Sequence, residues 1–175
     1  KLLNESSNSR NGFVTAGRQT PYKKIDLAVA ACTKLNLPLT VIGSGPDHYK
    51  LVKLAGPTVK FLTGVPDKDM AGHFAAAEAF IFPGVDDFGI VAVEAMSAGT
   101  PVIAYADGGA LDYVDDKTGR LFKPQTVEAL SRALEGFDPK SFKDADARTK
   151  AREFSPEIFR NKINKFIDSV RPAVG

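Results

Sequence analysis

Short apolar runs recur along the chain, and each is followed by a polar or glycine-bearing turn and then by a stretch with helical periodicity. The runs are rich in Val, Ile, Leu and Phe, which is typical of β-strands. They predict six strands, the last with the weakest pattern, at residues 13–16, 39–42, 59–62, 79–82, 102–105 and 120–122. Because most runs are apolar at consecutive positions, the strands should be covered on both faces, as in a parallel sheet.

Helices are predicted between the strands from the spacing of apolar residues and from helix start signals. They lie at residues 21–35, 46–54, 67–77, 89–98, 109–114 and 127–136. Strands that alternate with helices favour an α/β fold. We therefore expect a doubly wound, mainly parallel Rossmann-like sheet of about six strands with helices on both faces.

After Asp138 the strand pattern stops, and two C-terminal helices are predicted at residues 140–153 and 156–170. Ser155 is suited to cap the second helix, and Pro156 to occupy its first position. We expect the apolar stripe of this helix to pack on the core of the same domain. The alternative is that part of the stripe docks on a partner domain. The stripe consists of Phe159, Ile163, Phe166, Ile167 and Val170.

The amino-acid composition excludes several classes of protein. The 175 residues are 43% hydrophobic and 25% charged, as in an ordinary globular domain. The 23 Lys and Arg residues and the 21 Asp and Glu residues are scattered, so neither a nucleic acid nor an acidic membrane is indicated as a partner. No apolar run approaches the about 20 residues that span a bilayer. The single cysteine, Cys32, can form no internal disulfide, so we expect a reducing, cytoplasmic compartment.

Candidate ligand-binding residues follow the first two strands. In open parallel sheets, ligands bind beyond the carboxyl ends of the strands, where helix N-termini supply free amides and positive partial charge. Gly17, Arg18 and Lys23 follow the first strand, and the two cations could reach a diphosphate there, although solvated surface charges are the alternative. After the second strand, Gly43-Ser44-Gly45-Pro46 begins like a dinucleotide fingerprint. Its third glycine would fall at His48, so a tight turn fits equally well.

The turn after the fourth strand carries two acids. Asp86 precedes the predicted helix, and Glu94 lies eight residues later within it. We expect Glu94 to lie on an apolar, inward face, where a carboxylate needs hydrogen-bond partners such as ribose hydroxyls. The amides of residues 88–91 would be first-turn donors without partners in the helix, suited to a phosphate or sugar oxygen.

Together, residues 86–102, the loop from Gly17 to Lys23, Gly43-Ser44-Gly45-Pro46 and Gly108-Gly109 resemble the carboxyl-terminal domain of retaining glycosyltransferases of family 4. The resemblance runs from about residue 13 to residue 155. It implies one half of a GT-B fold, a two-domain fold in which this half binds a nucleotide-sugar donor and the other half binds the acceptor.

The resemblance also implies a role for each candidate. Arg18 and Lys23 fall where the family places two cations on the donor's diphosphate, in place of a metal. Asp86 matches the acid that contacts the transferred sugar, although the family's usual residue is a Glu, longer by one methylene. These three are the expected catalytic residues. Glu94 matches the acid that binds the ribose hydroxyls. The other donor contacts implied are Gly17, Val65 in the turn that reads the base, Phe88, Gly89, Ile90 and Val91.

The resemblance implies no metal and no cofactor beyond the donor substrate, and within the family the sequence of residues 87–91 resembles that of enzymes that use GDP-mannose. The D-x-D triplets at residues 67–69 and 144–146 are interpreted as helix-start and surface acids rather than metal ligands.

We therefore expect residues 13–155 to be the donor-binding domain of a retaining hexosyltransferase, with residues 1–12 as a linker and residues 156–175 as a C-terminal helix. An N-terminal acceptor domain of the same protein would be the partner, and any membrane association would come through missing parts. The chain alone should transfer no sugar. The alternatives are a GT-B-related epimerase or phosphorylase, which product analysis would identify, and a non-catalytic nucleotide-sugar-binding module, which would bind donor without transferring it.

Overall fold

In the computed structural model, which describes residues 10–170, six strands form one parallel sheet. The strand order is β3-β2-β1-β4-β5-β6, so the chain winds outward from β1 to β3 and then crosses back to β4 beside β1. This is the predicted doubly wound arrangement. All six strands are confirmed, and the last starts one residue earlier than predicted. They are β1 (Phe13–Ala16), β2 (Leu39–Ile42), β3 (Val59–Leu62), β4 (Ala79–Phe82), β5 (Val102–Tyr105) and β6 (Gly119–Phe122).

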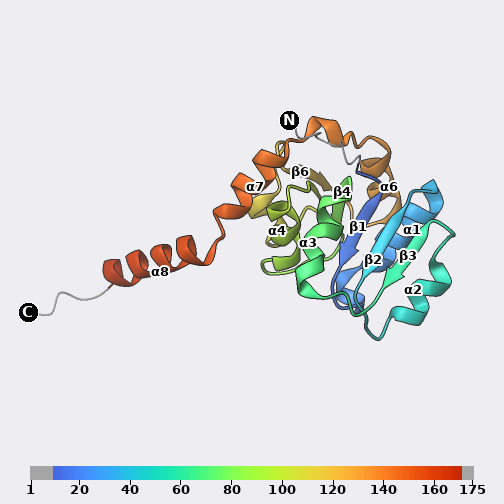
Figure 1. Ribbon diagram of the computed structural model, residues 1–175, viewed down its shortest axis with the longest axis horizontal. Helices are drawn as coiled ribbons and strands as arrows, with labels where there is room; N and C mark the ends of the chain where they lie inside the picture. The colour runs from blue at the N-terminus through green and yellow to red at the C-terminus, as the bar shows by residue number, and fades with distance from the viewer. Residues whose placement is uncertain (1–9, 171–175) are drawn as a thin grey trace, which may run out of the picture.

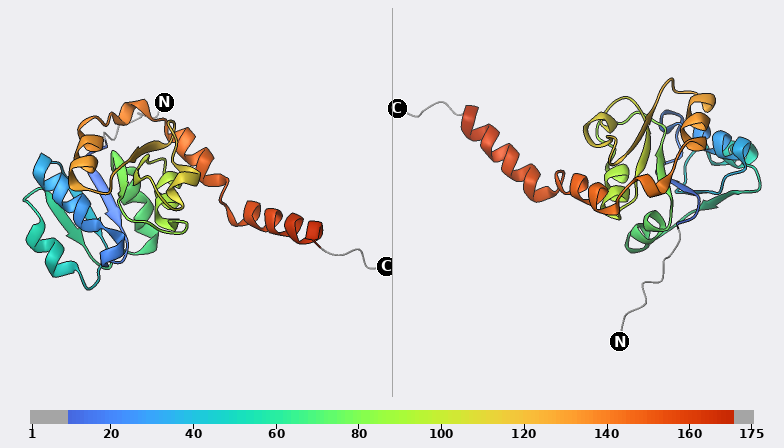
Figure 2. Two further views of the ribbon diagram at one scale, coloured as in Figure 1. Left: turned by 180° about the vertical axis from the view of Figure 1, so that it is seen from behind. Right: turned by 90° about the horizontal axis from the view of Figure 1, so that it is seen from above.

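Helices cover both faces of the sheet (Figures 1 and 2). Side chains alternate along each strand, so Ile81 and Ile103 belong to a core cluster shared with α1, α2 and α6, whereas Phe80 and Phe82 belong to the cluster of the opposite face, shared with α3, α4, α5 and α7. The helices are α1 (Ile25–Leu35), α2 (His48–Leu54), α3 (Asp67–Ala75), α4 (Ile90–Ser97), α5 (Ala110–Tyr113), α6 (Val127–Glu135), α7 (Asp144–Arg152) and α8 (Pro156–Val170), with 3-10 helices η1 (Pro21–Lys23) and η2 (Pro139–Ser141).

The predicted helix at residues 21–35 is interrupted at Lys24. The φ of Lys24 is 52°, in the left-handed region, and this residue therefore separates η1 from α1. Gly84, in the turn after β4, lies against this segment, because a Cβ at Gly84 would come within 2.8 Å of the Lys23 carbonyl oxygen. The interruption therefore brings the backbone of Lys23 directly beside the turn that carries Asp86.

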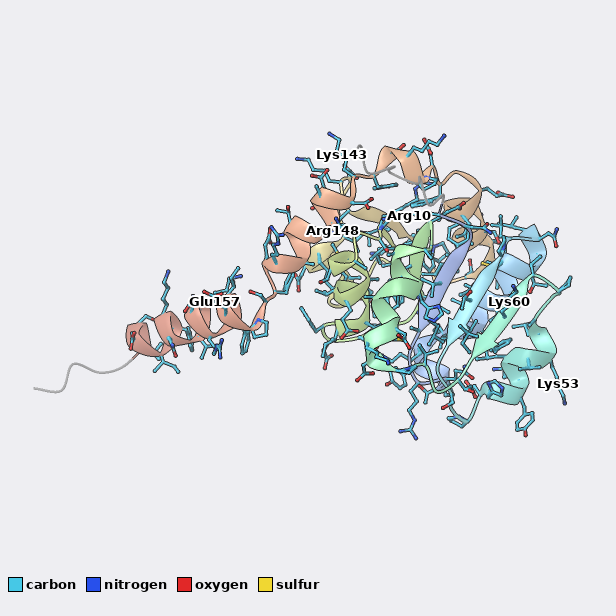
Figure 3. The ribbon with its side chains drawn as sticks, in the orientation of Figure 1. Arg10, Lys53, Lys60, Lys143, Arg148 and Glu157 are labelled. Carbon is cyan, nitrogen blue, oxygen red and sulfur yellow. The ribbon has the colours of Figure 1, made fainter. Side chains whose placement is uncertain are left out.

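The N-terminal boundary lies earlier than the predicted residue 13. The Arg10 guanidinium donates to the Gly99 carbonyl oxygen at 2.8 Å and pairs with Asp144 at 2.9 Å. Arg148, which belongs to α7, approaches the same Asp144 carboxylate at 3.8 Å, and both arginines are labelled in Figure 3. The Asn11 amide bonds to the Ala76 carbonyl oxygen. Residues 10–12 therefore belong to the domain, and the rest of the predicted linker, residues 1–9, lies outside the described residues.

The expected packing of the C-terminal stripe on this domain's core is wrong. Ser155 caps α8, since its Oγ accepts from the Ile158 amide at 3.4 Å, but α8 then projects away from the sheet and its helices (Figures 1 and 2). The five residues of the stripe are 41–64% exposed. The last part of the predicted C-terminal helix, residues 171–175, lies outside the described residues.

Candidate functional site

The turns after β1 and β4 meet at the point where the strand order reverses. β1 and β4 are neighbours in the sheet, so their carboxyl ends lie side by side at the same edge. Ligands of doubly wound sheets bind in the crevice at such a point. The predicted candidates Lys23 and Asp86 come from these two turns.

A cavity of about 480 Å³ lies at this junction and is called the Lys23 cavity below. It brings together one cation, one carboxylate and the start of α4. Sequence reasoning missed Tyr22, which is 59% exposed and whose ring centroid lies 5.3 Å from the Lys23 Nζ. An exposed aromatic residue in a 3-10 turn carries no sequence signal for a ligand. The cavity is lined by Tyr22, Lys23, Val85, Asp86, Asp87, Phe88, Gly89, Ile90 and Val91.

Lys23 and Asp86 form an ion pair through the Lys23 Nζ and the Asp86 Oδ2. Their side chains are only 21% and 17% exposed, so water screens the pair incompletely. The other carboxylate oxygen, Asp86 Oδ1, is buried and has no hydrogen-bond partner among residues 10–170. The sequence placed both residues at one site but gave no sign that they contact each other.

The start of α4 presents free backbone donors to the Lys23 cavity. The amides of residues 88–91 donate no hydrogen bond within the described part of the chain. Together with the helix dipole, such amides attract an anion. Gly89 allows this arrangement, because its φ is 81° and a Cβ there would come within 2.8 Å of the Phe82 ring.

A second cavity of about 290 Å³, called the Glu94 cavity, adjoins the first through Val91, which lines both. It contains the predicted residues Gly17, Val65 and Glu94. Gly17 has a φ of 145°, and a Cβ on it would meet no atom within 4 Å, so its backbone faces open space. The lining residues are Ala16, Gly17, Ile42, Gly43, Gly64, Val65, Asp67, Met70, Val91 and Glu94.

The expectation that Glu94 lies on an inward, apolar face is wrong. Glu94 is exposed, whereas Ala92, Val93, Ala95 and Met96 are buried. The buried face of α4 is therefore rotated from the one assumed, and Glu94 lies on the open side of the helix. Its carboxylate needs no buried partner and is accessible from the Glu94 cavity.

Arg18 is the predicted site residue that the structure does not bring to either cavity. Its side chain is exposed and forms no hydrogen bond or ion pair within residues 10–170. The next residue, Gln19, is fully buried, and its Nε2 donates to the Gly43 carbonyl oxygen at 2.8 Å. Gln19 thus fixes the backbone from which Arg18 projects.

The turn Gly43-Ser44-Gly45-Pro46 has a packing role. A Cβ at Gly43 would lie 2.2 Å from the Gly17 carbonyl oxygen, and one at Gly45 would lie 2.4 Å from that of Gln19. The glycines therefore let the turns after β1 and β2 approach closely. His48 stands where the fingerprint would need a glycine, and its Nδ1 lies 2.8 Å from the Gln19 Oε1, at hydrogen-bond distance.

Other candidate chemistry is limited in the part of the chain that the structure describes. No group of three or more His, Cys, Asp or Glu residues in residues 10–170 is arranged to hold a metal ion. None of the helices in that range is both long and apolar enough to cross a membrane. Cys32 is buried, and burial raises the pKa of its thiol to about 12.

Comparison with known proteins points to glycosyltransferases, both from a family model and from individual relatives. A family model described as "Glycosyl transferases group 1" matches residues 4–166. The GDP-mannose-dependent alpha-(1-6)-phosphatidylinositol monomannoside mannosyltransferase of Mycolicibacterium smegmatis is 31% identical over 69% of this chain and 37% of its own length. The D-inositol 3-phosphate glycosyltransferase of Streptomyces avermitilis is 33% identical over 70% of this chain and 31% of its own length. The chain thus spans about a third of the length of these relatives.

Solved structures support the same fold. A sucrose-phosphate synthase from Thermosynechococcus elongatus superposes with a TM-score of 0.79 at 28% identity, over 93% of this chain and 46% of that one. Anabaena HepE in complex with UDP superposes with a TM-score of 0.76 at 22% identity, over 94% of this chain and 50% of that one. In both cases the similarity covers about half of a longer chain.

Proposed function

Since the chain belongs to the glycosyl transferases group 1 family, with one half of a GT-B fold, we propose that it is the donor-binding domain of a retaining glycosyltransferase. The donor would be a nucleoside-diphosphate sugar, and no metal would be required. One observation carries the proposal most directly. Lys23 and the free amides at the start of α4 converge on one cavity that also contains a carboxylate, Asp86.

The Lys23 cavity suits a diphosphate. In the proposed complex, Lys23 exchanges its Asp86 partner for a phosphate oxygen, and the amides of residues 88–91 hold the second phosphate. Transfer with retention passes through an oxocarbenium-like sugar while negative charge grows on the departing phosphate. A cation and a helix N-terminus at that position stabilise the growing charge without a metal. Arg18 can join them only if its exposed side chain swings toward the cavity.

The two acids bind the two sugars of the donor in this proposal. Asp86 lines the Lys23 cavity and would contact the transferred sugar. Glu94 lines the adjoining Glu94 cavity with Gly17 and Val65, where the ribose and the base would lie. The exposed position of Glu94 favours this assignment, since a carboxylate on the open side of α4 can reach ribose hydroxyls directly. GDP-mannose is the proposed donor, in keeping with relatives described as GDP-mannose-dependent.

A second domain of the same protein would complete the active site. The exposed stripe of α8 and a cavity of about 750 Å³ between α4 and the beginning of α8 supply an apolar surface for it. Matching relatives are about three times as long as the matched segment, which leaves room for such a domain. On this basis the 175-residue chain binds donor but does not transfer sugar by itself. We also propose a cytoplasmic location, with which the one buried, free thiol is compatible.

The proposal is tested by measuring sugar transfer by this chain together with the proposed second domain of the same protein. The enzyme would be incubated with GDP-mannose, UDP-glucose or ADP-glucose, and with added EDTA in a parallel set. The expected result is transfer or slow hydrolysis of one donor, insensitive to EDTA, with the anomeric configuration retained in the product by NMR. Inversion would contradict the retaining mechanism, and loss of activity in EDTA would contradict metal independence. Donor binding with neither transfer nor hydrolysis would favour a non-catalytic module.

A further inference from the structure

Tyr113, the last residue of α5, is a buried polar residue that the proposed donor contacts do not use. It is 1% exposed, and its hydroxyl has no hydrogen-bond partner among the residues that the structure describes. Burial above all, and then the carboxylates of Asp86 and Asp112, raise the pKa of Tyr113. The hydroxyl therefore keeps its proton and is available as a donor. A buried hydroxyl without a partner costs free energy, so its position calls for a physical reason.

The hydroxyl lies directly beneath the start of α4. A Cβ built on Gly89 would lie 2.5 Å from the Tyr113 Oη, so the two residues are in close contact. The ring packs edge-on against Phe88 at 6.2 Å and Phe154 at 6.1 Å between centroids. Phe88 and Phe154 also contact each other at 5.4 Å between centroids, so the three rings form one cluster that holds the Tyr113 ring in place. Tyr113 does not line the Lys23 cavity, so it lies behind the cavity wall.

Asp86 offers a hydrogen-bond acceptor that could pair with the Tyr113 hydroxyl. Its Oδ2 pairs with Lys23, whereas its Oδ1 is buried without a partner. The Gly109 amide donates to the Asp86 carbonyl oxygen at 2.9 Å, which joins the Asp86 turn to the segment that leads into α5. An acceptor and a donor, both buried and both without partners, thus lie in the same small region.

We propose that Tyr113 is a positioning residue for Asp86, whose Oδ1 accepts a hydrogen bond from the Tyr113 hydroxyl when a bound diphosphate draws Lys23 away. The bond is direct or passes through one water. This inference rests on the proposed function, because it needs Lys23 to move onto the donor. Without Tyr113, departure of Lys23 onto a nucleotide that carries no sugar would leave a carboxylate that is only 17% exposed with no partner on either oxygen. Tyr113 compensates for that loss and holds Asp86 toward the cavity.

The test uses Tyr113→Phe in the 175-residue chain, which keeps the ring and removes only the hydroxyl. Tyr49→Phe is the matched control, because Tyr49 is 82% exposed on α2. Each variant is titrated with GDP and with UDP by calorimetry, and its thermal unfolding is recorded. For Tyr113→Phe we expect an unchanged or higher melting temperature together with about tenfold weaker nucleotide binding. Tyr49→Phe should change neither quantity.

A double-mutant cycle separates positioning from packing. In an Asp86→Ala background, Tyr113→Phe should alter nucleotide affinity less than about twofold, because the acceptor is gone. An equal loss in both backgrounds, or a lower melting temperature of Tyr113→Phe, would contradict the inference. If the wild-type chain binds nucleotide and Tyr113→Phe binds it equally well, the inference about Tyr113 is overturned but the proposed function is not. Failure of the wild-type chain to bind either nucleotide would instead count against the proposed function.

Discussion

Replacing Lys23 by Met removes the only cation that lines the Lys23 cavity in residues 10–170, while the apolar length of the side chain is kept. The change leaves Asp86, with a 17% exposed side chain, without its ion-pair partner. Two effects follow, because Lys23 is proposed to serve Asp86 in the free protein and a phosphate in the complex. Stability and nucleotide affinity should both fall.

The magnitudes follow from the burial of the pair. Exposed ion pairs contribute up to about 1 kcal/mol, and breaking a fully buried pair costs about 3–5 kcal/mol. An intermediate pair at 21% and 17% exposure suggests about 1–2 kcal/mol of lost stability. For a chain of this length, that lowers the melting temperature by roughly 2–8 °C. A charge-assisted hydrogen bond contributes about 1.5–3 kcal/mol, and part of it is offset by the broken Asp86 pair. Nucleotide binding should therefore weaken by roughly 5- to 30-fold.

The assay combines calorimetric titration with GDP or UDP and thermal unfolding of the same samples. Lys34→Met is the matched control, since Lys34 is exposed in the last turn of α1 and far along the helix from the site. It should leave affinity unchanged. Adding Asp86→Asn to Lys23→Met should recover much of the lost stability, because no uncompensated carboxylate remains. A dissociation constant for Lys23→Met within twofold of the wild-type value would refute the diphosphate assignment.

Three further predictions follow from the same structure. At Asp115, burial raises the pKa, but the Lys117 amide, the Thr118 hydroxyl and a nearby lysine outweigh it and lower the pKa below 3.8 overall. Asp115→Asn should therefore lower the melting temperature at pH 7 by at most about 4 °C, given the exposure of the group, and the difference should vanish as pH falls through the lowered folded-state pKa. The Cys32 thiol, with a pKa raised to about 12, should react with a thiol reagent at pH 8 on the order of 10³-fold more slowly than in denaturant. The double variant Phe159→Ser, Phe166→Ser should change stability by less than about 0.5 kcal/mol in denaturant unfolding, because both rings are over 60% exposed; a loss of several kcal/mol would mean that α8 packs on this domain.

The fold was largely predictable because its signals are local. Each strand is a short apolar run between turn residues, and each lies within one residue of its predicted position. The interruption at Lys24 was not predictable, because the segment carries no glycine or other local stop signal there, and the backbone of Lys23 meets Gly84, from a turn about 60 residues later, only in the folded chain. The direction of α8 was missed for a related reason. An apolar stripe indicates that a helix packs against something, but it does not say on which surface.

The candidate site was predictable as a set of residues but not as a geometry. Motif spacing placed Lys23, Asp86 and Glu94 at the carboxyl edge of the sheet. It could not reveal the Lys23–Asp86 ion pair, since that contact joins two turns that meet only in the folded chain. Glu94 was assigned to the wrong face, because α4 is apolar on nearly all sides and its periodicity does not identify the buried face. Tyr113 carries no motif, and only its burial beside Gly89 draws attention to it.

Mapping nucleotide binding by NMR on this 18.8 kDa chain tests the central claim most directly. GDP and UDP would be titrated into the isotope-labelled protein, and the amide shifts followed residue by residue. The account predicts saturable changes in the turn from Gly17 to Lys23, at Val65, and through residues 86–94, with the largest at the amides of residues 88–91. Saturable changes confined to other parts of the chain, or none with either nucleotide, would contradict it.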